Sequence, residues 1–317
     1  MAAFTWAYDK NSGAYQSHAL SKKLRFAAIC DTVFTQFAKP VDGFGKRKGE
    51  TVTITKIKNL TTPTSSALNE STRIPIDTFD IASGTITVEE LGRGVEYTSL
   101  ADDLSFFSLL NPIQRKLKDQ LAIVMDGLAA TQFKATYVVA VPTAASTITW
   151  DTDGTLSETG VNNLGYAHCG LIRDYMRDTL TIPWYEKSRY MGIASTKALR
   201  GIKSDGEFQA WRQYLEPGEV LYNSEVGTLE QIRFIESNNT SALSNAKGTG
   251  SVLGEAVIFG DDAVGLAEVQ APELRAAIPG DFGRSKAVAW YGVLAYGIIW
   301  ASTATAGEAR IVYISSA

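Results

Sequence analysis

Apolar and polar residues alternate along two stretches in the first third of the chain. In residues 50–58, Val52, Ile54 and Ile57 are interleaved with threonines and a lysine, and a similar alternation recurs within residues 84–97. Such period-two alternation of β-branched residues is typical of half-buried antiparallel strands. About 25 residues separate the two stretches, far too many for a tight hairpin turn. The pattern predicts a long two-stranded arm, which is marginally stable alone in water, so we expect its apolar face to need a neighbouring molecule.

A long amphipathic helix is predicted after the arm. Asn111 and Pro112 form a typical helix start, with asparagine as the capping residue and proline at the first helical position. Apolar residues then recur at steps of three and four, which places them on one face of the helix. This predicted core face consists of Ile113, Leu117, Leu121, Val124 and Leu128. The helix should end near residue 133, and a separate short helix is expected within residues 99–110.

The rest of the chain mixes helical and strand patterns. Helices are expected over residues 157–179, 196–203 and 207–214, and strands over residues 189–195 and within 225–236. The last segments with strand patterns are residues 287–299 and 310–314. The long helix is the obvious apolar partner for these terminal strands, so one domain would combine segments that are distant in the sequence. The expected fold class is α+β.

Composition describes a globular protein. The chain has 317 residues, of which 45% are hydrophobic and 20% charged, enough for two domains with cores of their own. Its net charge of -4 is not that of a nucleic-acid-binding chain. The two cysteines, Cys30 and Cys169, lie far apart and exclude a disulfide framework or a cysteine-rich zinc site. The N-terminus lacks the apolar segment of a signal peptide, and the apolar run 287–306 suits a buried strand at least as well as a membrane span.

A search for catalytic groups finds no complete set. His168 lies on the apolar side of a predicted helix beside Cys169, and adjacent helix positions point about 100° apart, so a buried, hydrogen-bonded histidine is favoured over a nucleophilic pair. Ser244 and Lys247 have Ser-x-x-Lys spacing without its companion motifs. The glycine-rich loop 247–254 fits neither a dinucleotide fingerprint nor a phosphate-binding loop. No catalytic, cofactor-binding or metal-ligating residues are therefore predicted.

Charged residues divide the predicted arm into a positive and a negative part. This asymmetry suits pairing between subunits, with nucleic-acid contact and simple solvation as the alternatives. The candidate contact residues are Lys46, Arg47, Lys48, Lys56, Lys58, Arg73, Asp77, Asp80, Glu89 and Glu90. Gly92 and Gly94 flank one residue between the arm and the helix, where they form either a hinge or a simple bulge.

Several segments follow one another in the order of a known family. KGETVTITK and ITVEELGRGVEYT resemble its extended loop, and NPIQRKLKDQLAIVMDGLAATQF resembles its spine helix. SRYMGIASTKALRGIKSDGEFQAW, with the pair Leu199 and Arg200, is similar to the start of its axial domain. EVGTLEQIRFIES, from Glu225 to Ser237, is similar to a further element. The family is that of the major capsid proteins of tailed phages, with the fold typified by phage Hong Kong 97, and the closest resemblance is to the coat family of the phage N-four type.

The resemblance implies a Hong Kong 97-type capsid fold in four parts. These would be an N-terminal arm (1–45), a two-stranded extended loop (46–97), a peripheral domain (98–187 and 270–317) with β-strands and a spine helix at about 112–133, and an α/β axial domain (188–269).

The function implied by the resemblance is that of a major capsid protein. It would assemble in the host cytoplasm into pentamers and hexamers of an icosahedral virion that encloses double-stranded DNA, without a membrane. Portal proteins and scaffolding or cement proteins would be its other partners. Two alternatives stay open, namely an encapsulin-like nanocompartment shell and an enzyme that uses the glycine-rich loop 247–254.

Overall fold

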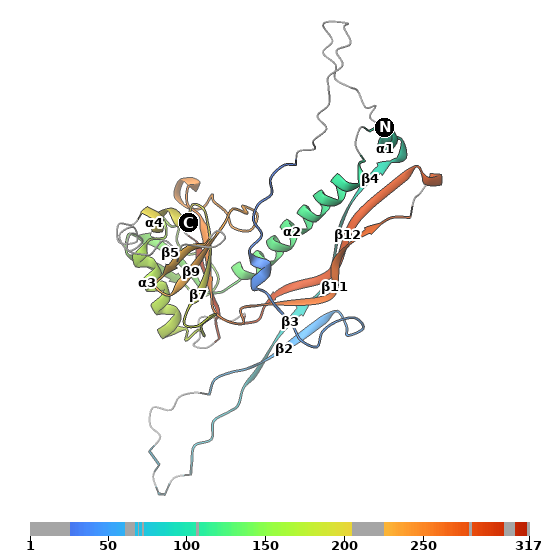
Figure 1. The fold of residues 1–317 in the computed structure, drawn as a ribbon. Coiled ribbons are helices and arrows are strands. Elements are labelled where there is room, and N and C mark those ends of the chain that lie inside the picture. Colours follow the sequence, from blue (N-terminus) through green and yellow to red (C-terminus); the bar gives the residue numbers. More distant parts are fainter. Residues whose placement is uncertain are drawn as a thin grey trace.

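The computed structural model describes residues 26–60, 67–68, 70–71, 73–105, 108–204, 225–278, 281–300 and 308–315. Figure 1 shows three parts: a long helix lying along an elongated sheet, a rounded body of strands and helices at one end of that helix, and a narrow arm directed away from both. The mixture of helices and largely antiparallel strands confirms the α+β class. The helix predicted at residues 207–214 lies outside the described residues.

The elongated sheet has four strands in the order β1-β11-β12-β4. Their bounds are Lys39–Pro40 (β1), Glu89–Thr98 (β4), Val264–Ala276 (β11) and Ser285–Ile298 (β12). β12 pairs antiparallel with both β11 and β4, whereas β1 pairs parallel with β11. Helix α2 (Leu110–Lys134) packs on β12, with Leu117, Trp290 and Leu294 buried in the shared core. The predicted contact between the long helix and the strand at 287–299 is confirmed.

Two details of the predicted helices are wrong. Helix α2 begins at Leu110, so Asn111 lies inside it, and the backbone N–H of Leu109 donates to Asp102 Oδ1 at 3.1 Å. Leu128 is exposed, whereas Ala129 and Phe133 are fully buried. The buried face shifts because the C-terminal half of α2 leaves the elongated sheet and packs against the rounded body. The short helix before α2 is confirmed as α1 (Ser99–Leu104).

The rounded body is built on a seven-stranded sheet with the order β6-β5-β13-β10-β7-β9-β8. Its strands are Val139–Ala144 (β5), Thr147–Asp151 (β6), Tyr190–Ser195 (β7), Glu225–Leu229 (β8), Ile232–Ser237 (β9), Glu255–Phe259 (β10) and Ile311–Ser315 (β13). Helix α3 (Tyr166–Asp174) continues as a π-helical turn over Tyr175–Thr179, and α4 (Leu199–Ser204) follows β7. The predicted helix at 157–179 therefore starts nine residues later than expected.

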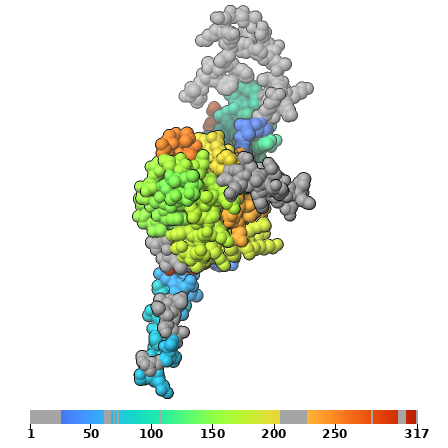
Figure 2. All heavy atoms as spheres, turned by 90° about the vertical axis from the view of Figure 1, so that its left-hand side faces the viewer, coloured from blue at the N-terminus to red at the C-terminus, as the bar shows by residue number. Residues whose placement is uncertain are grey.

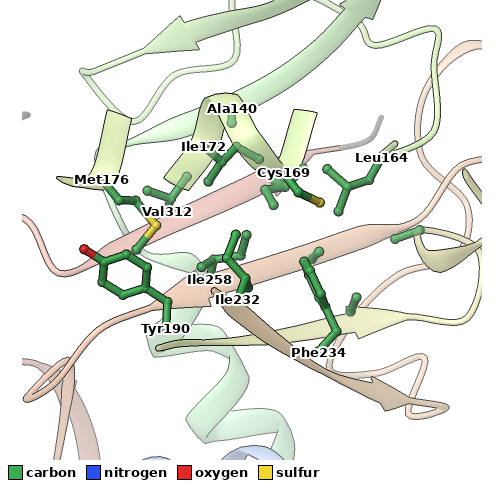
Figure 3. Close-up of a cluster of buried hydrophobic side chains, with 14 of the residues drawn as sticks. Ala140, Leu164, Cys169, Ile172, Met176, Tyr190, Ile232, Phe234, Ile258 and Val312 are labelled. Carbon is green, nitrogen blue, oxygen red and sulfur yellow. The ribbon is translucent and has the colours of Figure 1, made fainter. Parts of the chain in front are cut away.

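Both faces of the seven-stranded sheet are buried. On one face, Figure 3 shows Cys169, Ile172 and Met176 of the α3 region lying over strand residues that include Ile258 and Val312. On the other face, Phe133 of α2 and Phe34 of a 3₁₀ turn (Phe34–Phe37) pack against the sheet residue Phe259 and its neighbours. Helix α2 therefore joins the rounded body to the elongated sheet through a continuous apolar contact.

The sheets divide the chain at positions other than the predicted domain boundaries. β5, β6 and α3, which we assigned to the peripheral domain, belong to the seven-stranded body, as does β13 at the C-terminal end. β4, which we assigned to the extended loop, and the first residues of β11, which we assigned to the axial domain, lie in the elongated sheet. Strand pairing between distant segments determines these memberships, and local sequence patterns contain little information about it.

Residues 26–40 form a strap that touches both bodies. The backbone N–H of Phe34 donates to Asp126 Oδ1 at 2.7 Å, and Asn239 Nδ2 donates to Asp126 Oδ2 at 2.9 Å. Asp126 is fully buried in the middle of α2 and so joins the strap, the helix and the loop after β9. No described helix is long and apolar enough to cross a membrane, and residues 287–298 of the apolar run lie in β12.

Candidate inter-subunit surface

The base of the arm is a regular two-stranded ribbon. β2 (Thr51–Ile57) pairs antiparallel with β3 (Ile81–Thr87) without a register shift, from Thr51 opposite Thr87 to Ile57 opposite Ile81. The predicted pairing of the two alternating stretches is therefore confirmed for residues 84–87, whereas residues 89–97 of the second stretch lie in β4 and pair with β12 instead. Figure 2 shows the arm as a narrow column that extends well beyond the rounded body.

The two faces of the ribbon differ in chemistry. One face bears exposed hydroxyl side chains and ends in the exposed pair Ile57 and Ile81, and the hydroxyls of Thr51 and Thr87 lie 3.1 Å apart. The opposite face bears Val52, Ile54 and Ile86, of which Ile86 is buried against Gly297 of β12. We expected the apolar face to need a neighbouring molecule, but at Ile86 it packs on its own subunit.

From the last pair of the ribbon outward, the arm leaves large apolar side chains in solvent. Seven such residues are each more than half exposed: Ile57, Leu60, Leu68, Ile74, Ile76, Phe79 and Ile81. Seven large apolar side chains exposed within residues 57–81 indicate an interaction surface. The unsatisfied apolar surface is therefore located at the end of the ribbon and along the distal arm, farther out than the alternating pattern suggested.

Three of the charged candidates lie together at the base of the arm, where they interact within the subunit. Lys58 Nζ lies 3.4 Å from Asp80 of the returning strand segment and 3.6 Å from Glu308, before β13. Lys56 Nζ lies 5.8 Å from the centroid of the Trp300 ring. Lys58, through Glu308, and Lys56, beside Trp300, therefore connect the arm to its own body, while Asp80 pairs with Lys58 within the arm.

The other charged candidates lie apart from this connection. Lys46, Arg47 and Lys48 are exposed in the turn before β2, and Lys48 Nζ donates to the carbonyl of Gly43 at 2.5 Å. Arg73 and Asp77 are exposed on the distal arm, and Glu89 and Glu90 are exposed on β4. A hydrogen bond with Glu90 raises the pKa of Tyr291 on β12. It stays a prediction that these remaining charged candidates contact a second subunit.

Gly92 and Gly94 lie within β4, in unbroken register with β12. A Cβ at Gly92 would lie 3.0 Å from the carbonyl oxygen of Trp290, and one at Gly94 would lie 3.0 Å from Cβ of Ala289. Neither glycine has a positive φ, so the backbone conformation does not require glycine at these positions. The close approach of β12 by itself favours small residues here. Their function as a hinge stays a prediction.

A second exposed apolar surface lies at the far end of the elongated sheet. It comprises Leu100 and Leu104 of α1 with Ile278 and Phe282 at the turn between β11 and β12, and the last two are almost fully exposed. Phe282 also has a φ of 53°, and a non-glycine residue held in this conformation often marks a functional site. Sequence reasoning missed this surface, although the turn signal Pro-Gly-Asp-Phe-Gly at 279–283 contains the aromatic residue.

The glycine-rich loop is a closed structural turn. Lys247 and Leu253 exchange two backbone hydrogen bonds of 3.1 Å, and Lys247 Nζ lies 3.0 Å from Oε1 of the buried Glu255. Burial alone would raise the pKa of Glu255, but hydrogen bonds from Tyr313, Ser244 and Lys247 outweigh it and lower the pKa. Lys247 therefore forms part of a buried ion-pair network.

His168 is buried and hydrogen-bonded as predicted. Its Nδ1 accepts from the backbone N–H of Gly165 at 2.9 Å, so Nε2 carries the proton and donates to the carbonyl of Ala144 at 2.7 Å. Among the described residues, no group of three or more histidine, cysteine, aspartate or glutamate side chains is arranged to hold a metal ion. The extended surfaces, rather than a pocket with reactive groups, are therefore the candidate functional site.

A helix along an elongated sheet, a separate seven-stranded body and a projecting arm together form the fold of phage capsid proteins. The capsid of cyanophage Pam1 matches with a TM-score of 0.69 and 14% identity over 98% of this chain and 99% of that chain. The head structure of Helicobacter pylori bacteriophage KHP40 matches with a TM-score of 0.68 and 13% identity over 98% and 99%. The capsid of cyanophage P-SCSP1u matches with a TM-score of 0.65 and 13% identity over 100% and 99%.

The match extends over nearly the whole of each chain and so includes the arm. At these identities, it establishes the fold. No protein-family model matches the sequence, and neither does any curated protein. The predicted capsid fold is confirmed, while the resemblance to the N-four-type coat family stays a prediction.

Proposed function

We propose that this chain is the major capsid protein of a tailed phage, with the Hong Kong 97-type architecture. The observation that carries the proposal is the capsid fold over nearly the full chain length, including an arm that exposes apolar side chains to solvent. An arm of this kind gains burial only when another molecule covers it. In a closed shell of identical subunits, one heterologous contact is repeated throughout the assembly.

The proposed assembly consists of pentamers and hexamers that form an icosahedral head around double-stranded DNA. The seven-stranded body would serve as the axial domain, α2 with the elongated sheet as the peripheral domain, and the arm as the extended loop over an adjacent subunit. The far-end surface around Phe282 would form a second contact between subunits. Portal and scaffolding or cement proteins would be additional partners, and the mature location would be the virion after assembly in the host cytoplasm.

The proposed role is structural rather than enzymatic. The glycine-rich loop, which was the leading catalytic alternative, is closed by backbone hydrogen bonds and by the pair of Lys247 with Glu255. Mild net acidity suits an inner surface that lies beside DNA without binding it tightly. Packaged DNA would therefore be enclosed without sequence-specific contact.

Sedimentation and electron microscopy of the purified full chain test this proposal. We expect closed shells, formed either by the chain alone or with a scaffolding protein from the same gene cluster. A chain that remains monomeric under both conditions, while its arm is ordered and protected from protease, would contradict the proposal.

A further inference from the structure

A cleft of ≈ 270 Å³ lies where the arm meets both bodies. The arm contributes Lys58 and Asn59, the loop after α3 contributes Thr181, and the connection from β12 to β13 contributes Trp300 and Arg310. The cleft is therefore assembled from segments that are distant in the sequence. Its lining combines an aromatic ring with hydrogen-bond donors.

Trp300 lies beside two cations. The guanidinium carbon of Arg310 is 4.8 Å from the centroid of its ring, and Lys56 Nζ is 5.8 Å from it. The indole N–H of Trp300 and the Nε–H of Arg310 are both buried, and neither has a hydrogen-bond partner in the part of the chain that the structure describes. Buried donors without an acceptor are destabilising, so this place favours a ligand that brings acceptor oxygens.

The charges of the two cations beside Trp300 are incompletely compensated. Burial lowers the pKa of Lys56, and the opposing effect of Glu308 does not cancel it. Burial likewise lowers the pKa of Arg310 in spite of Asp262 and Asp261. A group with a lowered pKa would gain from an added negative charge nearby.

Lys58 provides an internal comparison. Hydrogen bonding to Asp80, together with the charges of Glu308 and Asp80, raises the pKa of Lys58. Its charge is therefore balanced within the subunit. The shortfall of negative charge therefore concerns Lys56 and Arg310, the two cations beside Trp300.

The shape and charge of the cleft suit a single carboxylate better than a polyanion. Carboxylates pair well with a guanidinium group that stacks on an aromatic ring. A nucleic-acid backbone would need a basic stripe longer than this cleft.

We propose that the cleft binds a carboxylate side chain of a second copy of this chain. The inference rests on the proposed shell function. Exposed carboxylates such as Glu70 and Asp77 lie on the distal arm, which Figure 1 shows leading away from its own body. Because they are exposed on a segment that leads away from the body, these groups are available to other copies.

Zero-length crosslinking tests this inference. Particles are assembled from an equal mixture of unlabelled and ¹⁵N-labelled full chains, treated with a carbodiimide and digested for mass spectrometry. We expect amide links from Lys56 or Lys58 to a carboxylate of the other isotope. Links from Lys58 to Asp80 or Glu308 of the same copy serve as the internal standard.

The variant Arg310→Gln, matched with Arg200→Gln at an exposed position on α4, checks which residue holds the carboxylate. We expect Arg310→Gln to reduce the mixed-isotope links at least several-fold, and Arg200→Gln to leave them unchanged. If Arg310→Gln does not fold, the wild-type links and the variant Arg310→Lys decide the matter. Particles with only same-copy links at both lysines overturn this inference alone, whereas a wild-type chain that forms no particles overturns the proposed function as well.

Discussion

Ile86 of the arm packs directly on the bare backbone of Gly297 in β12. A Cβ at position 297 would lie 2.5 Å from Cγ1 and 2.7 Å from Cδ1 of Ile86, and Ile86 is only 4% exposed. The arm is thus seated on the elongated sheet at a place where only glycine fits. Farther along the arm, the ion pair of Lys58 with Glu308 is a second contact between the arm and the body.

Gly297→Ala should displace the base of the arm. Overpacking of a buried site costs about 1–3 kcal/mol, and here the displaced group is the buried side chain of a ribbon strand. We expect a lower melting temperature of the unassembled subunit and faster proteolysis of β2 and β3. Gly127→Ala in α2 is the control, because a Cβ there meets nothing within 4 Å and alanine favours the helix by roughly 1 kcal/mol. Equal protease resistance of both variants would contradict the seating of the arm on Gly297.

Removal of the distal arm should separate folding from assembly. Deletion of residues 61–76, or the milder change of Ile74 and Ile76 to serine, removes apolar side chains that the subunit leaves exposed. Because surface changes usually alter stability by less than about 0.5 kcal/mol, we expect the serine variant to melt within a few degrees of wild type while particle yield falls several-fold. Leu156→Ser, at an exposed position on the rounded body, is the matched control. Normal particles from the deletion would mean that the arm is not a lattice contact.

Substitution of Gly92 and Gly94 tests the predicted hinge against simple close packing. If the two glycines act only as small residues beside β12, Gly92→Ala and Gly94→Ala should lower subunit stability. The variant that lowers the melting temperature more should then also slow shell maturation more. A hinge predicts a larger effect on the conversion of precursor shells to mature shells than on the melting temperature of the subunit. Cryo-electron microscopy of both shell stages, combined with calorimetry of the subunit, distinguishes the two outcomes.

Asp126 should give the subunit a measurable pH dependence. Burial raises the pKa of Asp126, although the hydrogen bonds from Asn239 and Phe34 oppose the shift. A carboxyl group with a raised folded pKa contributes stability that is fully present below its unfolded pKa, about 3.9, and is lost as the pH rises through the folded value. Asp126→Asn removes this titration, so its stability relative to wild type should increase between pH 4 and pH 7. Urea denaturation across that range measures the trend.

The control for this series is Asp119→Asn on the same helix, where the carboxylate pairs with Lys116 at 3.0 Å and is partly exposed. A stability difference for Asp126→Asn that does not change with pH, or that decreases as the pH rises, would contradict the assignment. Asp126→Ala should have a lower free energy of unfolding than Asp126→Asn at every pH. The alanine leaves the N–H groups of Phe34 and Asn239 without their acceptor.

The features that sequence reasoning predicted well are those determined by local periodicity. The first arm strand and helix α2 have strong periods of two and 3.6 residues, and their bounds lie within a few residues of the predictions. The second arm strand ends at Thr87, and the rest of its predicted range forms β4. The candidate site was located only in part. The arm was identified, but Lys56, Lys58 and Asp80 interact within the subunit, because the connection before β13 lies beside them.

Other features depend on contacts between distant segments. The membership of β5 and β13 in one sheet follows from the parallel pairing of Tyr313 with Val139, which no local pattern announces. Leu128 continues the apolar stripe of α2, yet it is exposed because the helix changes partner along its length. The surface at Phe282 was missed because a single aromatic residue in a turn is not part of any periodic pattern of apolar residues.

Helix α2 contributes to two hydrophobic cores, through Leu117 in the elongated sheet and through Phe133 in the rounded body. Neither core can open without exposing part of the same helix, so the two bodies should unfold as one cooperative unit with a single calorimetric transition. In a shell under internal pressure, each such subunit would move as one rigid body. The shell would then break first at the contacts between subunits, where exposed side chains rather than a shared helix hold neighbouring subunits together.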